Sequence, residues 1–150
     1  MTITTEQHDL RDRIAAIPER LAAGARVSSG EPPAPGEWTA SDILRHLIIV
    51  DDEVWLPRLR QAQSEEGPYW PDLVRVQWPG EPGASQDRLL EVFTGFRGDL
   101  VRLLDGLDEG GWARWGTHYK HGRLDVAGLL EIILEHDDEH VAAVEALPKA

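Results

Sequence analysis

Apolar residues recur three and four positions apart in four stretches of this chain, and this spacing predicts four amphipathic α-helices. The first helix follows Thr4 or Thr5, either of which can cap it, and its buried face consists of Leu10, Ile14, Ile17 and Leu21. Pro18 falls inside this stretch, so we expect a kink or a restart of the helix there. The second helix begins after Thr39, in a variant of the capping box, and runs from about Ala40 into the low sixties.

The third and fourth helices are separated from the others by long connections. The third follows a capping serine and is marked by an apolar seam of Leu89, Phe93, Phe96, Leu100, Leu103 and Leu107. The fourth covers residues 129–147, contains neither glycine nor proline, and follows Asp125 as its cap. Residues 64–84 and 108–123 show no strand pattern and are expected to be loops. The predicted fold is an all-α four-helix bundle, whose long loops leave its topology open.

Length, net charge and composition limit the number of domains, the binding partners and the metal ligands that this chain can have. At 150 residues the chain is long enough for one core, so we expect residues 1–150 to form a single domain. Its formal net charge of −12 argues against binding to nucleic acid or to anionic membranes. Cysteine is absent, so any metal site must use histidine, aspartate or glutamate. The polar N-terminus shows no signal peptide and no apolar run could span a bilayer, from which we expect a cytoplasmic protein.

Three histidines fall on the buried stripes of their helices. On a helical wheel, His136 and His140 lie in the middle of the apolar face of the fourth helix, one turn apart. His46 lies on the apolar stripe of the second helix. Buried imidazoles without partners are costly, so something in the core must satisfy them. A divalent metal ion is the leading candidate, with three nitrogen ligands and at least one position left open for water.

Carboxylates accompany these histidines. Glu53 falls on the same side of the second helix as His46 and is the candidate general base. Asp137 and Glu139 flank the histidine pair near the edges of the stripe, which suits hydrogen bonds to metal ligands. Pro57 removes one backbone hydrogen bond and frees the carbonyl of Glu53, so we expect a kink or a helix end nearby.

The histidine pattern also has a plainer interpretation. The spacing His-x-x-x-His occurs in many helices by chance, and core histidines could simply form hydrogen bonds with Asp42 or Glu53. His118 and His121 belong to a predicted loop, where we expect a solvent-exposed pair, although one of them could line a pocket.

The motifs around the three buried histidines resemble those of a known family. They consist of Trp38-Thr39 before a helix with His46-Leu47, and a late helix with His136-Asp137 and His140. This arrangement covers nearly the whole chain and resembles the DinB/YfiT-like superfamily of metal-dependent enzymes. The resemblance implies a four-helix bundle of up-down-down-up topology, commonly a homodimer. It also implies a divalent metal, zinc or nickel first and iron or manganese as alternatives, bound by His46, His136 and His140.

Two functions remain open at this point. The first is an enzyme whose metal activates water or a thiol for a small-molecule substrate, with Glu53 as the proton acceptor. Some members of the family resemble S-transferases or isomerases that use a low-molecular-weight thiol such as mycothiol or bacillithiol, and others are described as hydrolases. An anionic cofactor would favour a basic pocket mouth, for which the candidates, each more often a surface charge, are Arg45, Arg58, Arg60, Arg123 and Lys120. The second is a non-catalytic bundle with a structural or stress-associated role, whose metal site is closed by a protein ligand such as Glu53.

Overall fold

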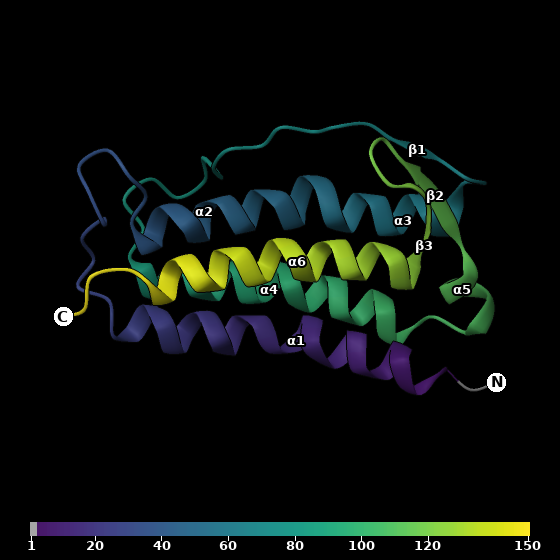
Figure 1. Cartoon of the computed structure of the whole chain (residues 1–150), viewed down its shortest axis with the longest axis horizontal. Coiled ribbons are helices and arrows are strands. Elements are labelled where there is room, and N and C mark those ends of the chain that lie inside the picture. The colour runs from purple at the N-terminus through teal and green to yellow at the C-terminus, as the bar shows by residue number, and fades with distance from the viewer. Residues whose placement is uncertain (1–2) are drawn as a thin grey trace.

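Four long helical rods lie side by side in the computed structural model, which describes residues 3–150 (Figure 1). They are α1 (Thr5–Arg26), α2 (Ala40–Val50) with its continuation, α4 (Gln86–Asp105) and α6 (Val126–Glu145). The continuation of α2 consists of a π-helical turn, η1 (Asp51–Trp55), and α3 (Leu56–Ser64), with no break in the helical backbone. The predicted all-α four-helix bundle is confirmed.

The directions of the rods give an up-down-down-up topology. α1 and α6 run one way along the bundle, and α2 and α4 run the other way (Figure 1). Both α1 and α2 pack against α4 and α6, so that α1 and α2 occupy opposite corners. Because α2 and α4 are parallel, the connection between α3 and α4 has to return along the whole bundle (Figure 1). This returning segment, residues 71–85, passes over His46 of α2, because the carbonyl of Val76 lies 2.8 Å from its Nδ1.

The predicted helix caps are present. The side chains of Thr4, Thr39, Ser85 and Asp125 each accept a hydrogen bond from a backbone N–H in the first turn of the helix that follows. Thr4 and Thr39 form complete capping boxes. These contacts satisfy donors that a helix cannot satisfy by itself, and they set where each rod begins.

α1 continues through Pro18, where a kink or a restart was expected. Proline lacks the N–H that would bond to the carbonyl of Ile14, four residues earlier. The Arg97 guanidinium of α4 donates to this carbonyl instead, with 3.2 Å between Nη1 and the oxygen. The backbone defect is therefore repaired by a side chain from another helix.

Arg97 is also the centre of a buried ion-pair cluster. It forms two-pronged hydrogen bonds with Asp51 and with Asp137, at N–O distances of 2.8 to 3.0 Å, and all three side chains are at most 1% exposed. All five N–H donors of the guanidinium are used. Burial alone lowers the pKa of Arg97, but the two carboxylates more than reverse this. Burial also raises the pKa of Asp51 in spite of Arg97; we favour the charged cluster because two-pronged pairing needs an ionised carboxylate.

The π-helical turn explains how the helix passes Pro57 without ending there. The N–H of Leu56 bonds to the carbonyl of Asp51, five residues earlier. A π-turn accommodates one extra residue, which rotates the following side chains by roughly 100° relative to a regular helix. As a result Val50, Val54 and Arg58 line the same pocket as His46, at a spacing of four.

The two predicted loops contain a small sheet. Its strands are β1 (Tyr69–Trp70), β2 (Trp115–His118) and β3 (Gly122–Asp125), and a short helix α5 (Glu109–Ala113) precedes β2. β1 is parallel to β2, and β2 forms an antiparallel hairpin with β3. Gly122 closes the hairpin with a φ of +72°. A side chain at Gly116 would lie 2.4 Å from the indole of Trp70, so only glycine leaves room for this side chain of β1 against β2.

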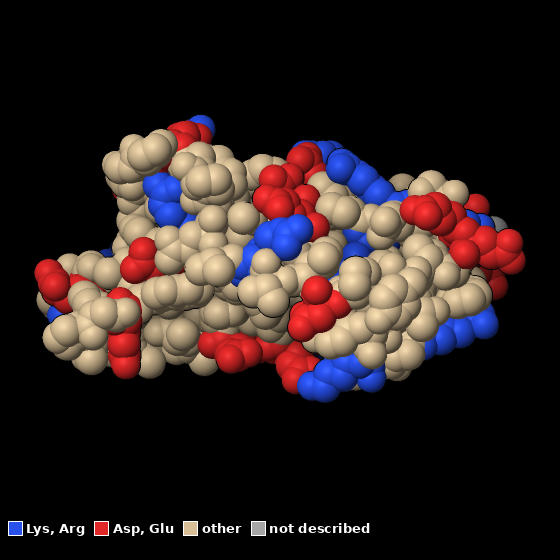
Figure 2. All heavy atoms as spheres, turned by 90° about the horizontal axis from the view of Figure 1, so that it is seen from above, with Lys and Arg blue, Asp and Glu red and all other residues tan. Residues whose placement is uncertain are grey.

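The surface adds two observations. Lys or Arg and Asp or Glu side chains alternate over the described atoms of the face in Figure 2, without a large area of either sign. None of the helices in residues 3–150 is long and apolar enough to cross a membrane.

Candidate metal centre

Three histidines from two helices meet between α2 and α6. Each of His46, His136 and His140 offers one ring nitrogen, and the three nitrogens lie within 4.8 Å of one another. The ring centroids are 4.5 to 5.2 Å apart. His136 and His140 are neighbours because residues four apart on a helix lie one above the other. The structure thus brings together the three residues that the helical wheels place on buried stripes.

The returning segment orients His46. Its Nδ1 lies 2.8 Å from the carbonyl oxygen of Val76, which can only accept a hydrogen bond. Nδ1 therefore carries a proton, and Nε2 is the ring nitrogen that faces His136. A backbone carbonyl that holds the second nitrogen in this way is the usual support for a metal-bound histidine.

His136 has one nitrogen without a partner. Its Nε2 lies 3.2 Å from Nε2 of His46, whereas its buried Nδ1 has no hydrogen-bond partner among residues 3–150. Burial, followed by the neighbouring His140 and His46, lowers the pKa of His136 to about 3. Burial likewise lowers the pKa of His140. Both imidazoles are thus neutral near pH 7, which is the form that binds metal.

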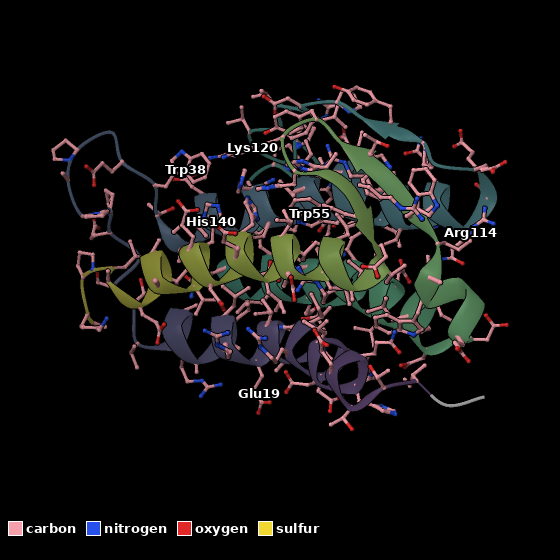
Figure 3. All side chains as sticks on the ribbon, turned by 45° about the vertical axis from the view of Figure 1, so that its right-hand side comes forward. Glu19, Trp38, Trp55, Arg114, Lys120 and His140 are labelled. Carbon is pink, nitrogen blue, oxygen red and sulfur yellow. The ribbon has the colours of Figure 1, made fainter. Side chains whose placement is uncertain are left out.

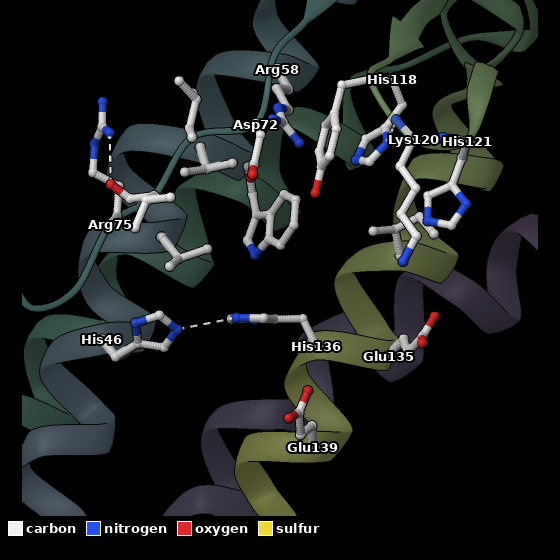
Figure 4. Close-up of a pocket in the computed structure, with 17 residues that line it drawn as sticks. His46, Arg58, Asp72, Arg75, His118, Lys120, His121, Glu135, His136 and Glu139 are labelled. Carbon is white, nitrogen blue, oxygen red and sulfur yellow. Dashed lines mark hydrogen bonds between the residues drawn. The ribbon is translucent and has the colours of Figure 1, made fainter. Parts of the chain in front are cut away.

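A pocket of about 450 Å³ opens over two of the histidines (Figure 4). His46 and His136 face each other at one end, and Arg58 and His118 line the other. A second pocket of about 260 Å³ is lined by His140 and Trp38. Trp38, His140 and Trp55 follow one another along the seam beside α6 (Figure 3). The cluster is accordingly reachable by small molecules, and the larger pocket has the size of a ligand site.

The carboxylates predicted to assist the histidines lie elsewhere. Glu53 was expected on the inward stripe, but it is exposed and bonded to Arg75, with 2.7 Å between its carboxylate and Nε. The physical reason is the π-turn, which rotates Glu53 away from the face that a regular helix would give it. Asp137, expected near the edge of the stripe, is fully buried and bonded to Arg97. Glu139 is exposed and lines both pockets.

These positions also weigh against the plainer interpretation. Asp42 accepts from the N–H and hydroxyl of Thr39, and Glu53 pairs with Arg75. Neither carboxylate forms a hydrogen bond with a histidine of the cluster in the described part of the chain. The carboxylate acceptors that the plainer interpretation needs are therefore not bonded to these histidines, and the buried Nδ1 of His136 has no acceptor in residues 3–150.

His118 was expected to be solvent-exposed, with a place in a pocket as the alternative, and it lines the larger pocket. It is 6% exposed and lies in β2, and its Nδ1 accepts from the N–H groups of Lys120 and His121. Its Nε2 must then carry the proton. Burial, and then the charge of Arg58, lowers the pKa of His118, which keeps it neutral. His121 is exposed, as expected, although it also lines the pocket.

Comparison with known proteins places these observations in a family. A family model described as the DinB superfamily matches residues 3–144. Among solved structures, a similar one is YfiT from Bacillus subtilis, described as a probable metal-dependent hydrolase with an unusual four-helix bundle topology. The match has a TM-score of 0.73 and 18% sequence identity, and covers 95% of this chain and 86% of that chain. At this identity the likeness establishes the fold alone. No curated protein matches the chain.

Proposed function

We propose, because this chain belongs to the DinB superfamily, that it is a metal-dependent enzyme whose divalent ion is bound by His46, His136 and His140. The observation that carries the proposal is the convergence of three ring nitrogens within 4.8 Å at one end of a 450 Å³ pocket. Three imidazole ligands fit zinc, nickel or iron(II), with zinc and nickel first, and suit manganese less well because manganese favours oxygen ligands.

The residues around the cluster fit this role. The carbonyl of Val76 orients His46, and burial keeps His136 unprotonated. When bound, the ion would supply a Lewis acid that makes a coordinated water or thiol nucleophilic near neutral pH. Trp55 and Val54 form an apolar wall of the pocket, which limits access of bulk water to the reacting groups.

Two reaction types are compatible with this site. Hydrolysis uses water as the nucleophile and is the activity suggested for YfiT. Transfer to a low-molecular-weight thiol uses the same ion and the same pocket. Both reactions need a proton acceptor. Glu139 is a better candidate than Glu53, because Glu139 lines both pockets whereas Glu53 is paired with Arg75.

A non-catalytic metal site would call for a fourth protein ligand that closes it. In residues 3–150 the potential ligand group comprises the three histidines alone, and Glu53, which could have closed the site, points to Arg75. The open pocket over His46 and His136 therefore favours the enzyme.

The test is an activity screen of protein loaded separately with zinc, nickel, iron(II) and manganese. Activated esters and amides report hydrolysis, and an electrophile with mycothiol or bacillithiol reports S-transfer. We expect one class to respond, and His46→Ala to abolish the response while its circular dichroism remains helical. Glu139→Gln and Glu53→Gln, compared side by side, identify the proton acceptor. Turnover that is equal with and without metal, or equal in His46→Ala, would contradict the proposal.

A further inference from the structure

Arg58 is buried in the larger pocket and forms no ion pair in residues 3–150. It comes from α3, is 4% exposed and lines the end of the pocket remote from His46. Only one of its five N–H donors forms a hydrogen bond in the described structure, from Nη2 to the carbonyl of Pro71 at 2.6 Å. Its Nε is buried and has no partner among residues 3–150. The guanidinium also lies 5.7 Å from the ring of Trp55, which offsets part of its burial.

Arg97 shows what a structural buried arginine looks like in this protein. Its five donors are all bonded and two carboxylates neutralise it. Arg58 has no ion pair in residues 3–150, and burial lowers its pKa in spite of Tyr119 and Asp72, which act in the opposite direction. A buried cation without a partner is costly, so an arginine kept in this state requires a compensating role.

The opposite wall of the pocket presents further donors. The Nδ1 of His118 accepts hydrogen bonds from two backbone N–H groups, so its Nε2 is a donor. Because the pKa of His118 is lowered, the imidazole is neutral and adds no positive charge next to Arg58. Lys120, exposed at the rim, adds a positive charge (Figure 4). This end of the pocket thus combines a cation, a neutral donor and a rim lysine.

We propose that Arg58 binds the carboxylate of a small monoanionic substrate whose other end reaches the three-histidine centre. The guanidinium carries one charge, which a carboxylate balances. A phosphate dianion would meet more repulsion, because Asp72, Glu135 and Glu139 also line the pocket. The size of the pocket suits a small organic acid rather than a polymer. The inference rests on the proposed function for the reaction at the far end, but not for the binding of the carboxylate.

The test uses butyrate and its neutral isostere butyramide, titrated into metal-free and zinc-loaded protein. Binding is followed through the ¹⁵N–¹H resonance of Arg58 Nε and by calorimetry. We expect butyrate to shift this resonance in both forms and butyramide to leave it in place. Arg58→Gln should weaken butyrate binding by roughly tenfold or more, the usual effect of losing a hydrogen bond to a charged group. Arg60→Gln, an exposed neighbour on α3, is the matched control and should change it less than twofold.

Several outcomes would overturn the inference. They are equal binding of butyramide and butyrate, an Arg58 Nε signal that does not move at saturation, and undiminished affinity in Arg58→Gln. Tighter binding of inorganic phosphate than of butyrate would overturn the carboxylate assignment. If Arg58→Gln does not fold, the resonance of the wild-type protein decides. Failure of the metal site leaves the titration of metal-free protein unaffected, so the two proposals fail separately.

Discussion

Two polar clusters lie inside the same bundle and are built on opposite principles. The Arg97 cluster, with Asp51 and Asp137, uses every donor of its guanidinium and touches all four rods, including the carbonyl freed by Pro18 in α1. The histidine cluster leaves the Nδ1 of His136 without a partner in residues 3–150 and opens onto a pocket.

The two clusters are linked by adjacent residues on α6. Asp137 faces the Arg97 cluster and is fully buried, whereas His136 faces the pocket. The number of partners within the chain therefore distinguishes structural from functional polar groups in this core. A group retained for the fold finds its partners within the chain, and a group retained for a ligand does not.

Removing Arg97 should have the largest effect on the fold. Arg97→Met leaves Asp51 and Asp137 buried without a cation, so we expect a loss of about 3–5 kcal/mol in unfolding free energy. Urea denaturation followed by circular dichroism measures it. Arg102→Met, which removes an exposed arginine of α4, should cost under about 1 kcal/mol. Equal losses in the two variants would show that the buried cluster does not hold the helices together.

Bound metal should stabilise the folded protein through the histidine cluster, by an amount that depends on the free metal concentration. At a free zinc concentration one hundred times the dissociation constant, we expect about 2.7 kcal/mol of added stability from binding to the folded state. Thermal denaturation with zinc and with a chelator reports the difference. His140→Ala should abolish it, while His121→Ala, an exposed histidine, should retain it. Stabilisation that survives in His140→Ala would point to zinc bound elsewhere.

Acid should weaken the metal-free protein through His136. Its pKa falls from 6.5 to about 3 on folding, so between these values the unfolded chain binds a proton that the folded chain excludes. Stability is therefore complete above pH 6.5 and declines as the pH falls toward 3, by at most about 1.4 kcal/mol per unit from this group. Urea unfolding of the wild type and of His136→Gln at pH 7, 6 and 5 tests this. Parallel pH profiles would contradict the assignment.

Glu53→Gln should have the smallest effect on stability and metal content. The pair of Glu53 with Arg75 is exposed, and such pairs contribute under about 1 kcal/mol. We expect unchanged metal stoichiometry by elemental analysis and a midpoint of urea unfolding close to that of the wild type. Loss of metal in this variant would place Glu53 at the centre, where the sequence predicted it.

Helices, caps and the meeting of the three histidines were predictable because they depend on local pattern. Thr39 with Asp42, and the positions of His136 and His140 on one stripe, need only the geometry of a regular helix. Arg97 was not predicted as a buried residue, although it lies between Phe93 and Leu100 of the apolar seam. Its partners Asp51 and Asp137 come from other helices, and the pattern of one helix does not show which residues of another helix it contacts.

The features that were missed depend on irregular or distant structure. A wheel at a constant angle cannot show a π-turn, and this displaced Glu53 from its expected face. The strands have two to four residues each, too few for an alternating pattern to stand out. His118 is buried because β2 pairs with β1, from a segment more than forty residues away in the sequence.

Metal stoichiometry shows whether His46, His136 and His140 bind a metal ion. Untagged wild-type protein and His136→Ala are purified without added metal, incubated with zinc or nickel, desalted and examined by elemental analysis. We expect about one ion per wild-type chain and essentially none in a folded His136→Ala. An absence of metal from both proteins, or equal amounts in both, would contradict this expectation and leave the three histidines as a cluster with no metal-binding role.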